Sequence, residues 1–349
     1  MIRACSFAGR CSTIVLLAVL AGAGCNDMES PLASDGTPSS PTDETGTTLG
    51  DSLTSIDTLT PTLVSVSYSG LPYGPTSLWK TLTTFEMGPE PFTLSQELVT
   101  AGSVIARINN ARSRRQRLVL AMTGGSANDY KTNGRFDLSK WKRRMNSFKT
   151  SAIRNAVAAG VSDGTVLGNV MMDEPETPKW GGNISKGLLD DMAAYAKGIF
   201  PTLPMGVNIG PPAYRWRASE RFHKVDWVRY QYSWWVTSGN VGAWRSVVLD
   251  QARKDGVTPA FSMNLLNGGT KDKRGSWNCP QSGRGTYRPN CRMAPDQVRE
   301  YGRAIGPSGC FMLMWRYDDA FMSRSGNRDA FRSVASLLAS KSRRSCRRS

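Results

Sequence analysis

The chain has 349 residues, with 44 Lys or Arg and 28 Asp or Glu, which give a formal net charge of +16. It contains one histidine, His223, which lies between a predicted helix and a predicted strand and is expected to be structural. A single histidine and the lack of a GxSxG elbow argue against HExxH zinc sites, most histidine-rich metal centres and a Ser-His-Asp triad, so proton transfer would rest on carboxylates, Tyr or Lys.

Residues 1–25 are typical of an export signal. Two arginines precede an uncharged, mostly apolar run at 12–23 that is too short to remain as a membrane-spanning helix. The run ends in LAGAGC, which resembles the lipobox of bacterial lipoproteins, except that Gly22 stands where that family usually has Leu. Two interpretations stay open: a lipoprotein with its lipid on Cys25, or an ordinary cleaved secretory signal. Either one predicts an extracytoplasmic protein, lipid-anchored to the cell envelope or secreted.

Residues 26–61 are rich in Ser, Thr, Pro, Gly and Asp and contain no Lys, Arg or aromatic residue. Such a stretch cannot bury enough apolar surface to offset its ordering entropy, which predicts a disordered tether. Four of the seven cysteines remain after residue 25, an even number that favours two disulfides in an oxidising compartment. We expect Cys279–Cys291 within one Gly-rich loop, and Cys310–Cys346 between a strand and the helix that returns to its start.

The predicted folded part is strongly basic. The first 61 residues hold two of the basic and seven of the acidic residues, so residues 62–349 carry 42 basic and 21 acidic residues. The excess favours anionic partners such as acidic glycans, lipopolysaccharide or nucleic acid, with a solvated basic surface as the alternative. Export makes nucleic acid the least expected of these. The basic tail at 341–349 is expected to be solvated.

Short apolar runs alternate with amphipathic stretches from residue 62 onwards, as in α/β proteins. Clear strands are predicted at 117–123, 166–173, 204–209, 225–232, 258–265 and 310–317. Helices are predicted near 100–113, 137–159, 185–199, 213–222, 240–254, 294–304 and 327–340, with Asp137, Ser185 and Asn327 as N-caps. The strands are continuous apolar runs, which indicates parallel strands buried on both faces.

Two weaker stretches decide the predicted architecture. If 63–69 is the first strand and 82–87 the second, the total is eight and a (β/α)8 TIM barrel closes over residues 62–340. Without them, an incomplete barrel or an open doubly wound sheet remains. We favour the barrel, irregular in its first two strands.

Acidic residues gather where a barrel would use them. The strand 166–173 runs into Asp173, Glu174 and Glu176, and the last strand runs into Asp318. Working residues of α/β barrels come from the carboxyl ends of strands, and paired carboxylates are what glycoside hydrolysis requires. The alternative is that these acids cap the next segment or pair with Arg316.

The tripeptide Asp173-Glu174-Pro175 resembles the N-E-P signature on strand four of the large glycoside hydrolase superfamily with (β/α)8 barrels. With two strands before residue 117, this strand is the fourth, as the resemblance requires. The resemblance implies that Glu174 is the general acid/base and that the substrate lies across the barrel mouth. Trp315, at the end of the eighth strand, is similar to that superfamily's tryptophan platform under the sugar.

The chain departs from that superfamily on strand seven, where the nucleophilic Glu is expected. Here the strand reads Phe-Ser-Met-Asn-Leu and includes Asn264 but no carboxylate. Either a second carboxylate comes from elsewhere, with Asp318 and Glu176 the best candidates and Glu86 another, or the protein binds glycans without cleaving them. A third alternative, motivated by charge alone, is an anion-binding envelope protein.

A polysaccharide is therefore the expected partner, with no cofactor and no metal. The expected substrate-binding side chains lie at strand ends: Asp173, Tyr230, Gln231, Trp234, Asn264, Trp315 and Arg316. The loop 267–293 carries six basic residues near the predicted mouth, which fits a uronic or sulfated glycan. The sequence leaves open which glycan is used and whether its configuration is retained.

Overall fold

The computed structural model describes residues 70–78, 91–182, 184–210, 220–234, 239–270, 291–305 and 308–348, all within one compact unit, Thr62–Ser349. Eight parallel strands form its main sheet in the order β1-β10-β9-β8-β7-β6-β3-β2. Their bounds are Tyr73–Pro75 (β1), Leu94–Leu98 (β2), Arg117–Ala121 (β3), Val166–Asp173 (β6), Met205–Ile209 (β7), Trp227–Tyr232 (β8), Thr258–Asn264 (β9) and Met312–Trp315 (β10).

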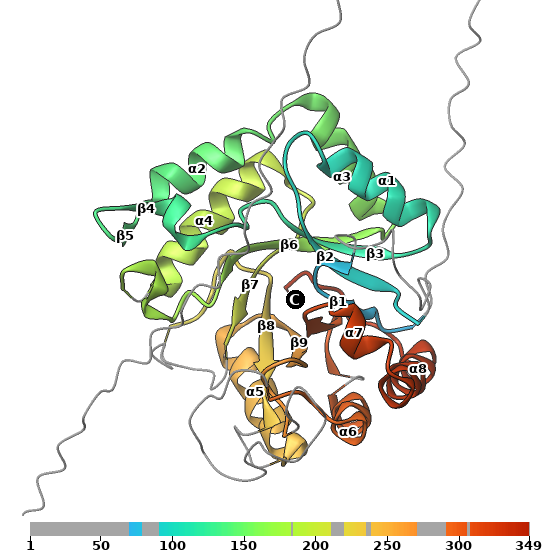
Figure 1. Cartoon of the computed structure of the whole chain (residues 1–349). Coiled ribbons are helices and arrows are strands. Elements are labelled where there is room, and N and C mark those ends of the chain that lie inside the picture. Colours follow the sequence, from blue (N-terminus) through green and yellow to red (C-terminus); the bar gives the residue numbers. More distant parts are fainter. Residues whose placement is uncertain are drawn as a thin grey trace, which may run out of the picture. The chain divides into compact units, whose positions relative to one another are not determined.

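The two ends of this sheet meet, so the strands form the predicted (β/α)8 barrel (Figure 1). A parallel bridge pairs Thr76 with Gln96 at the β1–β2 seam. The Thr93 N–H donates to the Tyr73 carbonyl at 2.9 Å, and the Ser77 N–H donates to the Gln96 carbonyl at 2.9 Å. The seam is a short contact because β1 has three residues.

The first two strands do not lie where the sequence predicted them. The structure places them at Tyr73–Pro75 and Leu94–Leu98, whereas the predicted stretches 63–69 and 82–87 lie outside the described residues. Both observed strands have weak sequence signals, since one contains Gly and Pro and the other contains Ser, Gln and Glu. Their pairing with stronger neighbours decides their conformation. Strand 166–173 is nevertheless the fourth in the barrel, as predicted.

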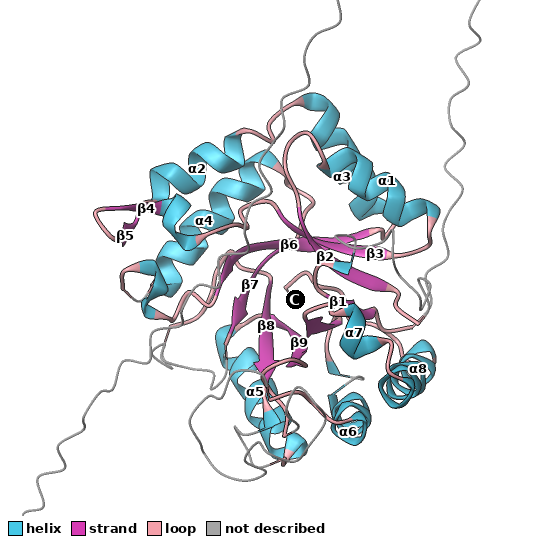
Figure 2. Ribbon diagram, in the orientation of Figure 1, coloured by secondary structure: helices cyan, strands magenta, loops and turns pink. Residues whose placement is uncertain are grey.

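Helices pack around the outside of the strands (Figure 2). Their bounds are Val104–Ser113 (α1), Leu138–Asn146 (α2), Ser151–Ser162 (α3), Lys186–Ile199 (α4), Val241–Asp255 (α5), Pro295–Ile305 (α6), Asp319–Met322 (α7) and Ser325–Ala339 (α8). None of the described helices is long and apolar enough to cross a membrane. The predicted helix at 213–222 falls mostly on residues outside the described ranges.

Two helix predictions need correction. The stretch 137–159 forms two helices because Thr150 caps α3, its side chain accepting a hydrogen bond from the Ile153 N–H. The caps Asp137 and Ser185 are confirmed. Asn327 lies inside α8, and its amide donates to the Phe321 carbonyl at 2.6 Å.

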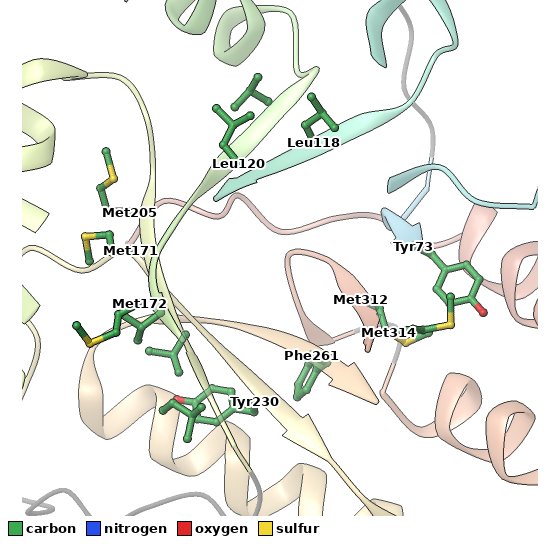
Figure 3. Close-up of a cluster of buried hydrophobic side chains, with 14 of the residues drawn as sticks. Tyr73, Leu118, Leu120, Met171, Met172, Met205, Tyr230, Phe261, Met312 and Met314 are labelled. Carbon is green, nitrogen blue, oxygen red and sulfur yellow. The ribbon is translucent and has the colours of Figure 1, made fainter. Parts of the chain in front are cut away.

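Alternate residues of each strand face two separate apolar layers. The larger layer lies between strands and helices, and Figure 3 shows some of its members, including Leu118, Leu120 and Met205. A smaller cluster, including Leu94, Val119, Leu167, Trp227 and Phe311, comes from the opposite faces of the strands. Side chains on those opposite faces therefore fill the barrel interior.

Trp227 closes the lower part of the barrel interior. It is fully buried, and its indole packs edge-on against Phe311 with ring centroids 5.1 Å apart. A β-carbon added at Gly206 would lie 2.1 Å from this indole, and one at Gly168 would lie 2.6 Å from it. Glycine at these positions of β7 and β6 is thus what leaves room for the ring.

The chain segment after α8 lies against the amino ends of the strands. The predicted disulfide Cys310–Cys346 is confirmed, and both cysteines belong to the interior cluster. The Thr258 hydroxyl donates to the Arg347 carbonyl at 2.9 Å, and the Arg347 guanidinium donates to the Thr202 carbonyl at 2.6 Å. The basic segment is therefore attached to the barrel floor, opposite the carboxyl ends of the strands, while Arg343, Arg344 and Arg347 are exposed, as expected of a solvated tail.

Candidate active site

The fourth strand, β6, delivers a group of acidic side chains to the barrel mouth. Asp173 is its last residue, and Glu174 follows with a φ of 46°, in the left-handed region. The Glu174 N–H donates to the Asn208 carbonyl of β7 at 2.9 Å, and the Thr177 hydroxyl donates to the Glu174 carbonyl at 2.8 Å. These bonds on both sides of Glu174 hold the bend that turns the chain across the mouth.

The turn brings Lys179 back onto the two acids. Its Nζ lies 3.0 Å from Oδ2 of Asp173 and 3.2 Å from Oε2 of Glu174. The next residue, Trp180, is buried, and its indole N–H donates to the Asp173 carbonyl at 2.9 Å. The Trp180 ring also contacts Tyr130 and Phe136, with centroids 6.4 Å and 5.9 Å away. Lys179 is thereby held from a fixed backbone position.

Polar side chains from three other strands support Asp173 from inside the barrel. The Asn208 amide of β7 donates to Oδ1 of Asp173 at 3.2 Å, and Nη2 of Arg229, on β8, lies 3.9 Å from the same oxygen. Arg229 is 4 % exposed and donates from Nη1 to Oε1 of Gln96, on β2, at 2.9 Å. The network therefore joins β8 to β2 across the barrel interior and to Asp173 at the end of β6.

The electrostatic environment shifts the pKa values of the two adjacent carboxyls, Asp173 and Glu174, in opposite directions. Desolvation would raise the pKa of Asp173, but the charges of Lys179 and Arg229 and the hydrogen bonds from Lys179 and Asn208 hold it below its ordinary value. Burial raises the pKa of Glu174, and the negative charge of Asp173 raises it further against the opposing effect of Lys179. Asp173 therefore ionises first, and Glu174 retains its proton to higher pH.

Glu176 is a third carboxyl in the group and is 5 % exposed. Its Oε1 accepts a hydrogen bond from the Gly210 N–H at 2.8 Å, and its Oε2 has no hydrogen-bond partner among the described residues. Burial raises its pKa to about 7, partly opposed by backbone hydrogen bonds. The site thus holds three carboxyls of different acidity within four consecutive positions of the chain.

Asp318, the other predicted catalytic acid, acts as a helix cap. Its Oδ1 accepts a hydrogen bond from the Phe321 N–H at 2.8 Å, so it caps α7. Its Oδ2 lies 3.8 Å from Nη2 of Arg292, whose guanidinium also packs over the Phe321 ring. Glu86 lies outside the described residues. Among the predicted partners of Glu174, Glu176 is the one that shares its loop.

The predicted substrate-binding residues divide into two groups. Trp315 is half-buried at the end of β10, with the Arg316 guanidinium 5.7 Å from its ring centroid, and the peptide bond between them is cis. Gln231 is the next-to-last residue of β8, and Asn264 is the last residue of β9, where its side chain accepts a hydrogen bond from the Asn267 N–H at 3.0 Å.

Tyr230 was expected to meet substrate and is instead a core residue. It is fully buried in the layer between strands and helices (Figure 3). Its neighbour Arg229 faces the interior, and strand alternation sends Tyr230 to the other side. Trp234 is half-buried; its N–H donates to the Gly268 carbonyl at 2.6 Å, and its ring packs against Tyr232 with centroids 6.4 Å apart.

Sequence reasoning missed Lys179, Arg229, Asn208 and Gln96. An arginine inside the apolar run 225–232 was a usable signal, because a charge on a strand buried on both faces needs partners in the barrel. The sequence offered no such signal for Lys179, because its contact with the acids depends on the turn after β6.

Two of the predicted cysteine assignments fall on residues that the structure does not describe. Cys25 and Cys279 lie outside the described residues, and Cys291 is disulfide-bonded.

No protein-family model matches the chain, and no curated protein matches it. Solved structures with a similar fold include glycoside hydrolase barrels. A GH113 β-1,4-mannanase is 10 % identical with a TM-score of 0.46, over 77 % of this chain and 98 % of the other. A β-mannanase from the blue mussel Mytilus edulis is 13 % identical with a TM-score of 0.43, over 77 % and 92 %. The GH18 chitinase ChiB of Flavobacterium johnsoniae is 9 % identical with a TM-score of 0.42, over 78 % and 96 %.

Proposed function

We propose that the protein is a glycoside hydrolase-like barrel that cleaves a polysaccharide, with Glu174 as the proton donor. The observation that carries this proposal is the pair of adjacent carboxyls at the end of the fourth strand, whose pKa values are displaced in opposite directions. Such a displacement separates an acid from an anion at one pH. A mouth at the carboxyl ends of eight parallel strands is where barrels of this type carry their chemistry.

Each carboxyl has a distinct part in this chemistry. Protonated Glu174 donates its proton to the leaving glycosidic oxygen as the glycosidic bond breaks, and ionised Asp173 stabilises the positive charge that develops on the sugar. Water then adds to the sugar and its released proton restores protonated Glu174. Glu176, with a pKa of about 7, is the nearest further carboxyl in sequence that can exchange a proton near neutral pH. Trp315 at the end of the eighth strand supplies a flat ring against which a sugar face can stack.

The preferred substrate in this proposal is an acidic polysaccharide, because residues 62–349 carry twice as many basic as acidic side chains. We further propose an extracytoplasmic location with a lipid on Cys25, based on the apolar run and small residues before it. Metabolic labelling with a radioactive fatty acid tests the anchor. Label should enter the wild-type chain and be lost in Cys25→Ser, whereas equal labelling of both would refute it.

Reducing-sugar release from neutral and acidic polysaccharides tests the catalytic proposal. The variant Glu174→Gln keeps the shape of the side chain but has no acidic proton, so release should fall by about 10²–10⁴-fold. Glu300→Gln, at an exposed position of α6, is the matched control and should release sugar at the wild-type rate. Equal release by Glu174→Gln and wild type would remove Glu174 from the mechanism.

A second function is favoured by a specific observation on strand seven. That strand ends in Asn264 and has no carboxylate, and the ammonium of Lys179 already contacts both acids of strand four. These features fit a barrel that binds glycans without cleaving them. Tight binding of a polysaccharide that is recovered unchanged, with the same affinity in Glu174→Gln, would establish this function.

A further inference from the structure

The proposed reaction assigns no role to Lys179, although its side chain contacts both acids at the mouth. Its Nζ is the one cationic atom of the described residues that lies within 3.2 Å of both Asp173 and Glu174. It is 36 % exposed, so it is reached from the substrate side, while Arg229 approaches Asp173 from the buried side.

The loop is built in a way that fixes this ammonium. Pro178 starts a 3-10 turn, Trp180 is anchored by its indole bond to the Asp173 carbonyl, and Gly181 ends the turn with a φ of 78°. A β-carbon at Gly181 would lie 1.9 Å from the Gly134 carbonyl oxygen, so the turn also packs tightly on the β4–β5 hairpin, residues 131–136. Lys179 therefore extends from a backbone that is held on both sides.

We propose that Lys179 is a positioning residue that bridges the two neighbouring carboxyls, holding Asp173 as the anion and orienting Glu174 as the acid. This inference rests on the proposed function and extends it to the control of proton occupancy. An ion pair with Asp173 is kept throughout the reaction. The contact with Glu174 weakens when that carboxyl takes up its proton, which frees the acid to face the glycosidic oxygen.

The expected pH dependence follows from the groups that face the pair. These are Lys179 on the loop, Arg229 on β8, Asn208 on β7 and Glu176 beyond the bend. The Lys179 charge lowers the pKa of both Asp173 and Glu174. Activity requires ionised Asp173 and protonated Glu174, so the acidic limb of the pH profile reports the first and the alkaline limb the second.

Replacing Lys179 by Met should therefore move both limbs to higher pH. An opposite charge at this distance lowers the pKa of a carboxyl by about one unit, so each limb should move by about one pH unit. Lys179→Arg retains the charge and should keep the wild-type limbs. Lys149→Met, at an exposed position beside Tyr195, removes a lysine far along the chain from the site and should change neither limb. A lysine with a merely structural role would lower the rate without moving the limbs.

A direct titration separates this inference from the proposed reaction. Carboxyl ¹³C NMR of the full protein, with Asp173 and Glu174 assigned by Asp173→Asn and Glu174→Gln, should show both midpoints rising in Lys179→Met and returning in Lys179→Arg. Unchanged midpoints in Lys179→Met overturn the role of Lys179 even if glycan is cleaved. Displaced midpoints in a protein that cleaves no glycan support the role of Lys179 and count against the hydrolase.

Discussion

Glu176 gives the sharpest stability prediction, because burial raises its pKa from 4.5 to about 7. In the unfolded chain this carboxyl ionises near pH 4.5, whereas in the folded protein it keeps its proton until about pH 7. Between these values the folded state binds more protons, so stability falls as pH rises through this window. A separation of about 2.5 pH units corresponds to about 3 kcal/mol, complete above about pH 7.

The variant Glu176→Gln removes that titration while keeping the hydrogen bond that the Gly210 N–H donates to the side-chain oxygen. Urea unfolding at pH 5 and pH 8 measures the effect. The free energy of unfolding of the variant, minus that of the wild type, should be about 2.5 kcal/mol higher at pH 8 than at pH 5, because the wild type already loses a small part of its stability by pH 5. Glu300→Gln, which is exposed on α6, should show no such dependence. A Glu176→Gln difference that is the same at both pH values would refute the reasoning.

Two further predictions concern contacts away from the mouth. Lys186→Met should cost about 3–5 kcal/mol in urea unfolding, because Lys186 and Asp255 are 1 % and 0 % exposed and the carboxylate would lose its buried cation. The exposed pair Lys254–Asp250 is the control, and Lys254→Met should cost less than about 1 kcal/mol; equal costs would contradict this account. The double variant Cys310→Ser with Cys346→Ser opens a loop of 36 residues and should lower the free energy of unfolding by about 4 kcal/mol. Thermal unfolding under oxidising conditions compares it with the wild type, and an unchanged midpoint would contradict the prediction.

Much of the fold was predictable from local pattern. Six of the eight strands lie within a few residues of the predicted stretches, because a long apolar run bounded by polar residues has few other ways to be buried. The predicted order of strands and helices also placed Glu174 next to the end of the fourth strand, and it predicted the disulfide Cys310–Cys346. These features depend on the order of elements along the chain, which the sequence contains directly.

The first two strands and the helix break at 147–150 depended on weaker information. The strand Tyr73–Pro75 contains Gly and Pro, and its pairing with β10 and the hydrogen bonds between Tyr73 and Thr93 hold it extended. Thr150 was a readable cap signal within an otherwise continuous helical pattern. Contacts distant in sequence decided the first case, and a local hydrogen bond decided the second.

The sequence by itself determined which residues are available for chemistry: one histidine, three acids within four positions at the end of the fourth strand, and an excess of basic residues in the rest of the chain. Only the tertiary structure decided which of them meet. Arg229 faces the barrel interior and Tyr230 faces the helices, although both stand in one apolar run. Successive side chains of a strand point to opposite faces of the sheet, and closure of the barrel decides which face becomes the interior. The bend after β6 likewise placed the ammonium of Lys179 between two carboxyls, a contact that depends on backbone geometry over six residues.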